Sequence, residues 1–147
     1  MKRVYVNEKW CLGCHLCEYN CAFANSGKKD MADALRGKPI FPRIHIEGDE
    51  RISYAVSCRH CEDPMCVKSC IAGAISREDG VIHIDQSKCV GCYTCILVCP
   101  YGALAVNESG VMQKCELCLQ NSCGKPACVL GCPNNAIVYE ERGDSNG

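Results

Sequence analysis

A run of cysteines from Cys89 to Pro100 carries the most specific chemical pattern in the chain. Its spacing is Cys-x2-Cys-x2-Cys-x3-Cys-Pro. Three thiolates placed three residues apart on one tight loop suit a single iron–sulfur cubane, and the fourth suits a neighbouring cluster. A zinc site usually takes separated pairs of ligands instead. Gly91 fits the cubane because a residue without Cβ lets the backbone N–H groups approach the cluster sulfurs.

The same pattern recurs along the chain, so the cysteines form four groups that behave as an internal repeat. The first group has the spacing of the third and carries Gly13 where the third has Gly91, but Ala22 follows its last cysteine. The second group has two extra residues between its second and third cysteines. These groups are Cys11, Cys14, Cys17 and Cys21; Cys58, Cys61, Cys66 and Cys70; and Cys89, Cys92, Cys95 and Cys99.

The fourth group is irregular because it holds one cysteine more than a cubane needs. We assign Cys128 to the ligands, since Cys128-x3-Cys132-Pro133 repeats the ending of the third group. Cys123 is then left as an unpaired thiol. The alternative, in which Cys123 is a ligand and Cys128 is free, stays open. The assigned ligands are Cys115, Cys118, Cys128 and Cys132.

Seventeen cysteines in 147 residues exceed the usage of ordinary globular domains. The N-terminal sequence has no apolar signal core and no twin-arginine motif, which predicts a cytoplasmic chain with reduced thiols. No apolar run approaches the roughly 18 residues of a membrane span. The formal net charge is -1, and thiolate-bound clusters would make it more negative, so nucleic acid is excluded as a partner.

Short strands and helices must position these groups. The sequence predicts a strand over 2–7 and a helix over 28–36 that Gly37 ends. Three hairpins are predicted, each leading into the next cysteine group. Their strands are 43–47 with 51–56, 75–77 with 81–84, and 104–106 with 111–113. The cysteine-free segment 22–57 is either a surface that contacts a partner or a lid that keeps water off a cluster.

Three residues next to ligand cysteines, His15, His60 and Lys114, are positioned to tune a cluster through charge or hydrogen bonding. For the two histidines we favour a solvated or capping role instead, and for Lys114 both interpretations stand equally. The chain has no glycine-rich phosphate loop, no Ser/His/Asp set and no spare metal-ligand group. We therefore expect electron transfer rather than catalysis, with a catalytic subunit and a zinc-stabilised interaction module as the alternatives.

The four groups, with the long gap in the last one, resemble the four-cluster polyferredoxin subunits of molybdenum and tungsten oxidoreductases and of their hydrogenase and carbon monoxide dehydrogenase relatives. The resemblance covers the chain from Val4 to about Val138. The stretches 11–18, 58–64 and 113–118 are similar to the small soluble branch that serves carbon monoxide dehydrogenases and tungsten aldehyde oxidoreductases.

This resemblance implies an α+β fold of two ferredoxin-like modules related by pseudo-twofold symmetry, nucleated by iron–sulfur clusters, with short hairpins and helices. The inner module would span 58–110, the outer module 1–57 with 111–139, and a flexible tail 140–147. Each of four [4Fe-4S] clusters would take one ligand from a distant group. The implied sets are Cys58, Cys61, Cys66 and Cys99; Cys89, Cys92, Cys95 and Cys70; Cys11, Cys14, Cys17 and Cys132; and Cys115, Cys118, Cys128 and Cys21.

The function implied by the resemblance is an electron-transfer subunit, not an enzyme. It would relay electrons between a large catalytic oxidoreductase subunit, from a tungsten aldehyde oxidoreductase or a carbon monoxide dehydrogenase, and a flavoprotein or ferredoxin-type partner. An electron-relay subunit of a formate dehydrogenase or hydrogenase complex is the alternative. Because the clusters form a chain from end to end, stacking on copies of itself into a filament is a further hypothesis.

Overall fold

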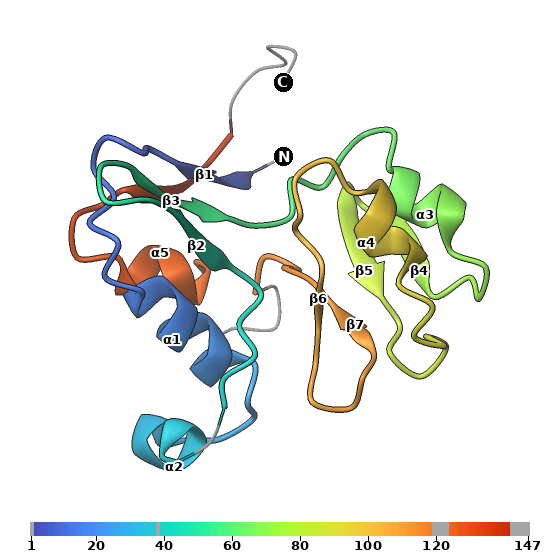
Figure 1. The fold of residues 1–147 in the computed structure, drawn as a ribbon, viewed down its shortest axis with the longest axis horizontal. Coiled ribbons are helices and arrows are strands. Elements are labelled where there is room, and N and C mark those ends of the chain that lie inside the picture. The colour runs from blue at the N-terminus through green and yellow to red at the C-terminus, as the bar shows by residue number, and fades with distance from the viewer. Residues whose placement is uncertain (1, 38, 119–123, 142–147) are drawn as a thin grey trace.

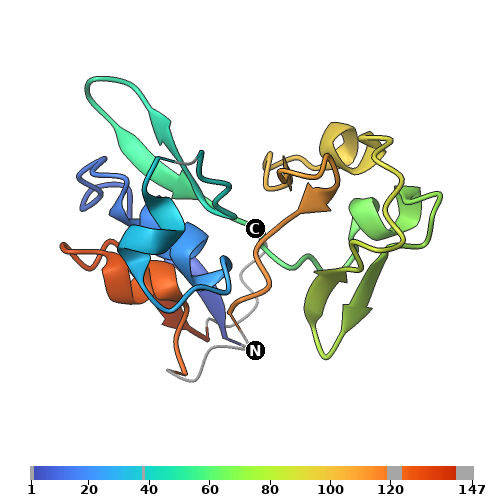
Figure 2. The same ribbon diagram turned by 90° about the horizontal axis from the view of Figure 1, so that it is seen from below.

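The computed structural model describes residues 2–37, 39–118 and 124–141. Figures 1 and 2 show two lobes joined by a narrow middle. The first lobe contains β1 (Arg3–Val6), α1 (Leu16–Ala24), α2 (Met31–Leu35), β2 (His45–Gly48), β3 (Ser53–Val56), α5 (Ala127–Gly131) and β8 (Ile137–Glu140). The second contains α3 (Met65–Ser69), β4 (Ile75–Glu78), β5 (Val81–Ile84) and α4 (Thr94–Val98). Strands β6 (Ala105–Val106) and β7 (Met112–Gln113) pack on this second lobe, on the side that faces the first.

The first lobe is closed by the two ends of the described chain. Strand β1 pairs antiparallel with β8, with Val4 opposite Tyr139. Helix α1 packs on α5, and the core between helices and strands contains Ile44, Ala55 and Ile137. This arrangement brings the first and fourth cysteine groups into one lobe.

Strand β8 is absent from the sequence-based expectations. Its residues Ile137, Val138 and Tyr139 are β-branched or aromatic, and they follow the turn-forming Pro133 and neighbouring asparagines, so the signal was present. The predicted tail also began too early, because Glu140 pairs with Arg3 in the sheet. The rest of that tail, 142–147, lies outside the described residues.

The predicted hairpins are confirmed with slightly different bounds. Between β2 and β3 the Asp49 carboxylate accepts hydrogen bonds from the backbone N–H groups of Arg51 and Ile52, at 2.8 and 3.1 Å. Between β4 and β5 the turn residues Asp79 and Gly80 have φ of 49° and 80°. Two positive φ angles give the twist that a two-residue hairpin needs.

Helix α2 confirms the predicted helix over 28–36 but begins later. The Asp30 side chain accepts a hydrogen bond from the Ala32 N–H at 3.0 Å, so Asp30 is the N-cap. Gly37, just beyond the helix, has a φ of 64°, as expected of a residue that ends a helix.

The second lobe has a core of its own, which contains Ile75, Ile82, Leu104 and Met112. Helix α3 packs on α4 as α1 packs on α5, which brings the second and third cysteine groups together. The described residues form four two-stranded sheets and short helices, a small mixed α/β protein. None of the described helices has the length and apolar character to cross a membrane. The exact module boundaries and the pseudo-twofold relation stay predictions.

Truncating Ile44, which is 1% exposed, should destabilise the first lobe. Leu or Ile to Ala substitutions at buried sites cost about 2–5 kcal/mol. We therefore expect Ile44→Ala to lower the guanidinium midpoint followed by far-ultraviolet circular dichroism under anaerobic conditions. The matched control is Ile71→Ala, because Ile71 is 79% exposed and should leave the midpoint unchanged. Equal midpoints for the two variants would contradict the placement of this core.

Candidate iron-sulfur centres

Every cysteine loop turns through a left-handed residue directly before its second cysteine. These residues are Gly13, His60, Gly91 and Leu117, with φ of 65°, 48°, 71° and 61°. For a residue with a side chain this conformation costs on the order of 1–3 kcal/mol and persists only where the surroundings impose it. The second and fourth loops adopt the left-handed conformation although they have His60 and Leu117 in place of glycine. All four loops therefore follow the same backbone path.

Each helix carries the last cysteine of its group away from its own loop. Cys70, Cys99 and Cys132 are the C-cap residues of α3, α4 and α5, and Cys21 lies within α1. Because α1 packs on α5 and α3 on α4, each helix delivers its last thiol beside the loop of the partner helix. The local helix geometry thus favours ligands that are shared between groups.

Two cavities are each lined by a complete implied ligand set. We call Cys11, Cys14, Cys17 and Cys132 set A, and Cys70, Cys89, Cys92 and Cys95 set D. Set A lines a cavity of about 320 Å³ and set D one of about 340 Å³, both volumes including the open mouth. A water molecule occupies about 30 Å³ in the liquid, so each cavity has room for a group of several atoms. The remaining lining is mostly apolar, as with Ile75 and Met112 beside set D.

The other two implied sets are recognised by their mutual electrostatic effects. Set B is Cys21, Cys115, Cys118 and Cys128, and set C is Cys58, Cys61, Cys66 and Cys99. Burial, together with the charges of Cys58 and Cys99, raises the pKa of Cys66 to about 11. Burial also raises the pKa of Cys128, as do the charges of Cys115, Cys21 and Cys118. Burial raises the pKa of Cys61 as well, and the charges of Cys58 and Cys99 add to that rise. The four members of each set therefore lie near one another.

The residues of the four sets fit iron–sulfur clusters. Thiolates are the ligands that these clusters take, and hydrogen bonds to sulfur help to set their potentials. Several sulfur atoms already accept such bonds: Cys21 Sγ from the Arg43 N–H at 3.2 Å, Cys70 Sγ from the Ala74 N–H at 3.3 Å, and Cys58 Sγ from the His60 N–H at 3.4 Å. Cys115 Sγ accepts from the Leu117 N–H at 3.4 Å. In residues 2–37, 39–118 and 124–141, no three His, Cys, Asp or Glu side chains are placed to hold a single metal ion.

Burial also determines whether the free thiols are protonated. It raises the pKa of Cys17 to about 12 with help from the Glu18 carboxylate, and that of Cys115 to about 12. These thiols are protonated at neutral pH in the metal-free chain, so iron must displace their protons when it binds. Cys92 is the opposite case, because a hydrogen bond from the Thr94 hydroxyl lowers its pKa.

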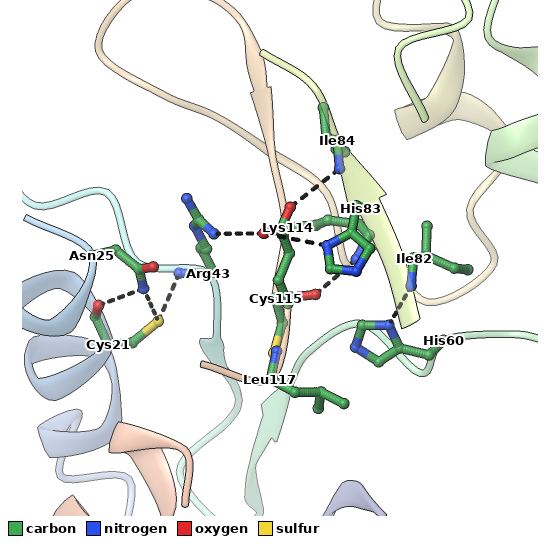
Figure 3. Close-up of polar contacts among 11 residues, drawn as sticks. Cys21, Asn25, Arg43, His60, Ile82, His83, Ile84, Lys114, Cys115 and Leu117 are labelled. Carbon is green, nitrogen blue, oxygen red and sulfur yellow. Dashed lines mark hydrogen bonds and ion pairs between the residues drawn. The ribbon is translucent and has the colours of Figure 1, made fainter. Parts of the chain in front are cut away.

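A partly buried network of polar contacts joins the lobes, and Figure 3 shows its centre. The Ile82 N–H donates to Nδ1 of His60 at 3.0 Å, and the Ile84 N–H donates to the Glu116 carboxylate at 3.1 Å. The Gln113 side chain donates to the Phe41 carbonyl at 2.7 Å. Strand β7 is thereby tied to the first lobe through Gln113, and the segment that follows it is tied to β5 through Glu116.

The three residues next to ligand cysteines differ in their surroundings. His15 is exposed and hydrogen-bonds to Glu18 at 2.8 Å, in agreement with a solvated role. The same prediction is wrong for His60, which is 0% exposed. Burial, together with the charge of Lys114, lowers the pKa of His60 to about 3. Lys114 is itself buried, whereas Cys123 lies outside the described residues.

Comparison with known proteins agrees with these centres. Residues 51–142 match the family described as 4Fe-4S dicluster domain. The chain is 37% identical over 148 residues to the electron transport protein HydN of Escherichia coli K12, covering 90% of this chain and 83% of HydN. It is 38% identical over 150 residues to an iron-sulfur protein of Rhodospirillum rubrum, covering 91% and 79%. It is 34% identical over 153 residues to one subunit of the sulfite dehydrogenase of Allochromatium vinosum, covering 88% and 64%.

The chain belongs to the 4Fe-4S dicluster family of electron-transport proteins. The predicted iron–sulfur chemistry and electron transfer are thereby confirmed, and the cysteine content is consistent with four [4Fe-4S] clusters. The name of HydN, an electron transport protein, is consistent with a role as an electron carrier. The particular branch of the family and the ligands of each cluster stay predictions.

Replacing Cys99 tests whether groups share ligands. Cys99 ends the third group, but the implied set C places it with Cys58. We expect Cys99→Ala to lose about 4 of ~16 iron atoms per chain, or to convert one cluster to a three-iron form, because each cubane holds four irons. Its electron paramagnetic resonance spectrum should match that of Cys58→Ala.

Two further variants complete this test. A Cys99→Ala spectrum that matches Cys92→Ala instead would show that the third group closes its own cluster. Cys123→Ala should keep the full iron content, whereas Cys128→Ala should not. The reverse pattern would favour Cys123 as the ligand.

Proposed function

We propose that this protein is a linear electron relay whose four clusters are held by sets A, B, C and D. When bound, the clusters supply one-electron transfer. The observation that carries the proposal is the crossed placement of the cysteines, in which Cys132 completes the cavity of set A and Cys70 that of set D. The two lobes would then correspond to two ferredoxin-like modules related by pseudo-twofold symmetry.

The ligand sets follow one another in a single order. Cys17 of set A and Cys128 of set B belong to one buried core. Cys115 of set B and Cys58 of set C pack against another. The core of the second lobe includes Cys66 and Cys99 of set C with Cys89 and Cys95 of set D. The order A, B, C, D therefore runs from the first lobe to the second.

Sets A and D at the ends of this order reach the surface. Cys14 and Cys92 are the exposed members of their sets. Apolar side chains that line the same cavities are also exposed, Leu12 by 65% and Val90 by 67%. Partners could approach both ends of the relay, so we assign electron entry and exit to these two faces.

For the partners we propose a large catalytic oxidoreductase subunit at one face and a flavoprotein or ferredoxin-type protein at the other. The similarity to a component of a sulfite dehydrogenase supports an oxidoreductase complex. Within that class we propose a tungsten aldehyde oxidoreductase or a carbon monoxide dehydrogenase, on the cysteine-flanking stretches described above. A reducing compartment such as the cytoplasm suits thiolate-bound iron.

A formate dehydrogenase or hydrogenase complex is the second candidate for the partner. A second copy of the protein is the third candidate, because both ends of the proposed relay carry exposed apolar side chains on which copies could stack. Anaerobic co-purification separates these cases through the metal of the large subunit. Tungsten or molybdenum would indicate an aldehyde or formate enzyme, and nickel a carbon monoxide dehydrogenase or hydrogenase.

Anaerobic voltammetry of the isolated protein on an electrode tests the relay itself. We expect a brown protein with ~16 irons that takes up about 4 electrons per chain reversibly, because each cluster accepts one. Cys115→Ala should interrupt set B and slow electron exchange, while Cys123→Ala should behave as wild type. A colourless, zinc-rich protein without electron uptake would contradict the relay, and turnover of formate, an aldehyde or carbon monoxide by the isolated chain would indicate a catalytic subunit.

A further inference from the structure

Lys114 is a buried cation in the segment that joins the two lobes. Its side chain is 2% exposed, and it is the single Lys or Arg classed as buried within residues 2–37, 39–118 and 124–141. Nζ donates one hydrogen bond, to the Cys115 carbonyl at 2.7 Å. Figure 3 shows the side chain between β5 and the strand that leads to Cys115. A lysine buried in this way needs negative charge nearby, because burying an uncompensated ammonium is strongly unfavourable.

No side chain in the described part of the chain forms an ion pair with Lys114 that would supply that charge. The Glu116 carboxylate is engaged elsewhere, with Arg43 at 3.9 Å, His83 at 3.7 Å and the Ile84 N–H. His60 accepts a hydrogen bond at Nδ1, so its hydrogen is on Nε2, which has no partner among the described groups. The neighbourhood of Lys114 is therefore short of negative charge.

Lys114 faces two different ligand sets. Its Nζ donates to the backbone carbonyl of Cys115, a member of set B, at 2.7 Å. Cys115 and Cys58 pack against the same small buried core, formed with Val81 and Leu117. Sets B and C are thus the two inner sets of the proposed order, and Lys114 lies within electrostatic reach of both.

We propose that Lys114 is the shared counter-charge of the two inner clusters and that it holds both in a more easily reduced state than they would have without it. The inference rests on the proposed ligand sets. A cluster bound by four thiolates carries net negative charge, and reduction makes it more negative. A fixed cation beside two such clusters favours their reduction, because cluster potentials depend on nearby charge. It also offsets the repulsion between them at the crossing from one lobe to the other.

The chain contains a matched control for this position. Lys88 precedes Cys89 as Lys114 precedes Cys115, so both lysines stand directly before the first cysteine of a group. The Lys88 side chain is 62% exposed, and its Nζ lies 4.0 Å from the Asp85 carboxylate. Solvent screens a charge in that setting, so Lys88→Met should change cluster reduction little.

The experiment is an anaerobic dithionite titration followed by electron paramagnetic resonance, after iron has been quantified. The variants are Lys114→Met, Lys114→Gln, Lys114→Arg and Lys88→Met. In the Met and Gln variants we expect the reduction equilibria of two clusters to shift tenfold or more toward the oxidised form, which is ~59 mV or more for one electron. The other two clusters should shift much less. Lys114→Arg should stay close to wild type, as should Lys88→Met.

Loss of iron in both neutral variants but not in Lys114→Arg supports the inference, because the positive charge is then required to hold the inner clusters together. Full iron with all four reduction equilibria within twofold of wild type in either neutral variant would overturn it. So would a Lys114→Arg protein that behaves like Lys114→Met. Wild-type protein without ~16 irons would instead overturn the proposed function.

Discussion

The packing of α1 on α5 and of α3 on α4 is the constraint on which the rest of the structure depends. In every group a helix begins near the third cysteine and delivers the last thiol one turn later, beside the partner helix. If the proposed sets are ligated, each pair of clusters also ties its two helices together. Metal binding and folding are then the same event for each lobe, as in other small proteins whose folding depends on metal. This explains how short helices and two-stranded sheets can make a stable protein.

The region where the two lobes meet buries polar and charged groups. Two inner sets of thiolates approach each other where the lobes meet, in a region that contains buried polar groups. Backbone N–H groups of β5 bond to His60 and Glu116 there, and Lys114 contributes a positive charge. Such groups cost free energy to bury unless they are paired. We infer that these groups remain buried because the hydrogen bonds and the positive charge of Lys114 allow two negative clusters to lie close together.

The iron–sulfur chemistry could be predicted from the sequence because cysteine spacing is a direct consequence of cluster geometry. The hairpins could also be predicted from the sequence, since residues such as Asp79 and Gly80 specify a tight turn. The pairing of β1 with β8 could not be predicted, because two short strands at opposite ends of a chain carry no local signal of each other. The burial of His60 was missed for a related reason. Its neighbours in sequence are polar, and what buries it is β5, through the Ile82 N–H.

The central claim is that each of four clusters takes one ligand from a distant cysteine group. An iron anomalous map from anaerobically grown crystals tests it most directly. We predict four cubanes, held by Cys11, Cys14, Cys17 and Cys132; by Cys21, Cys115, Cys118 and Cys128; by Cys58, Cys61, Cys66 and Cys99; and by Cys70, Cys89, Cys92 and Cys95. A cubane closed by the last cysteine of its own group, or zinc in place of any cubane, would contradict the account.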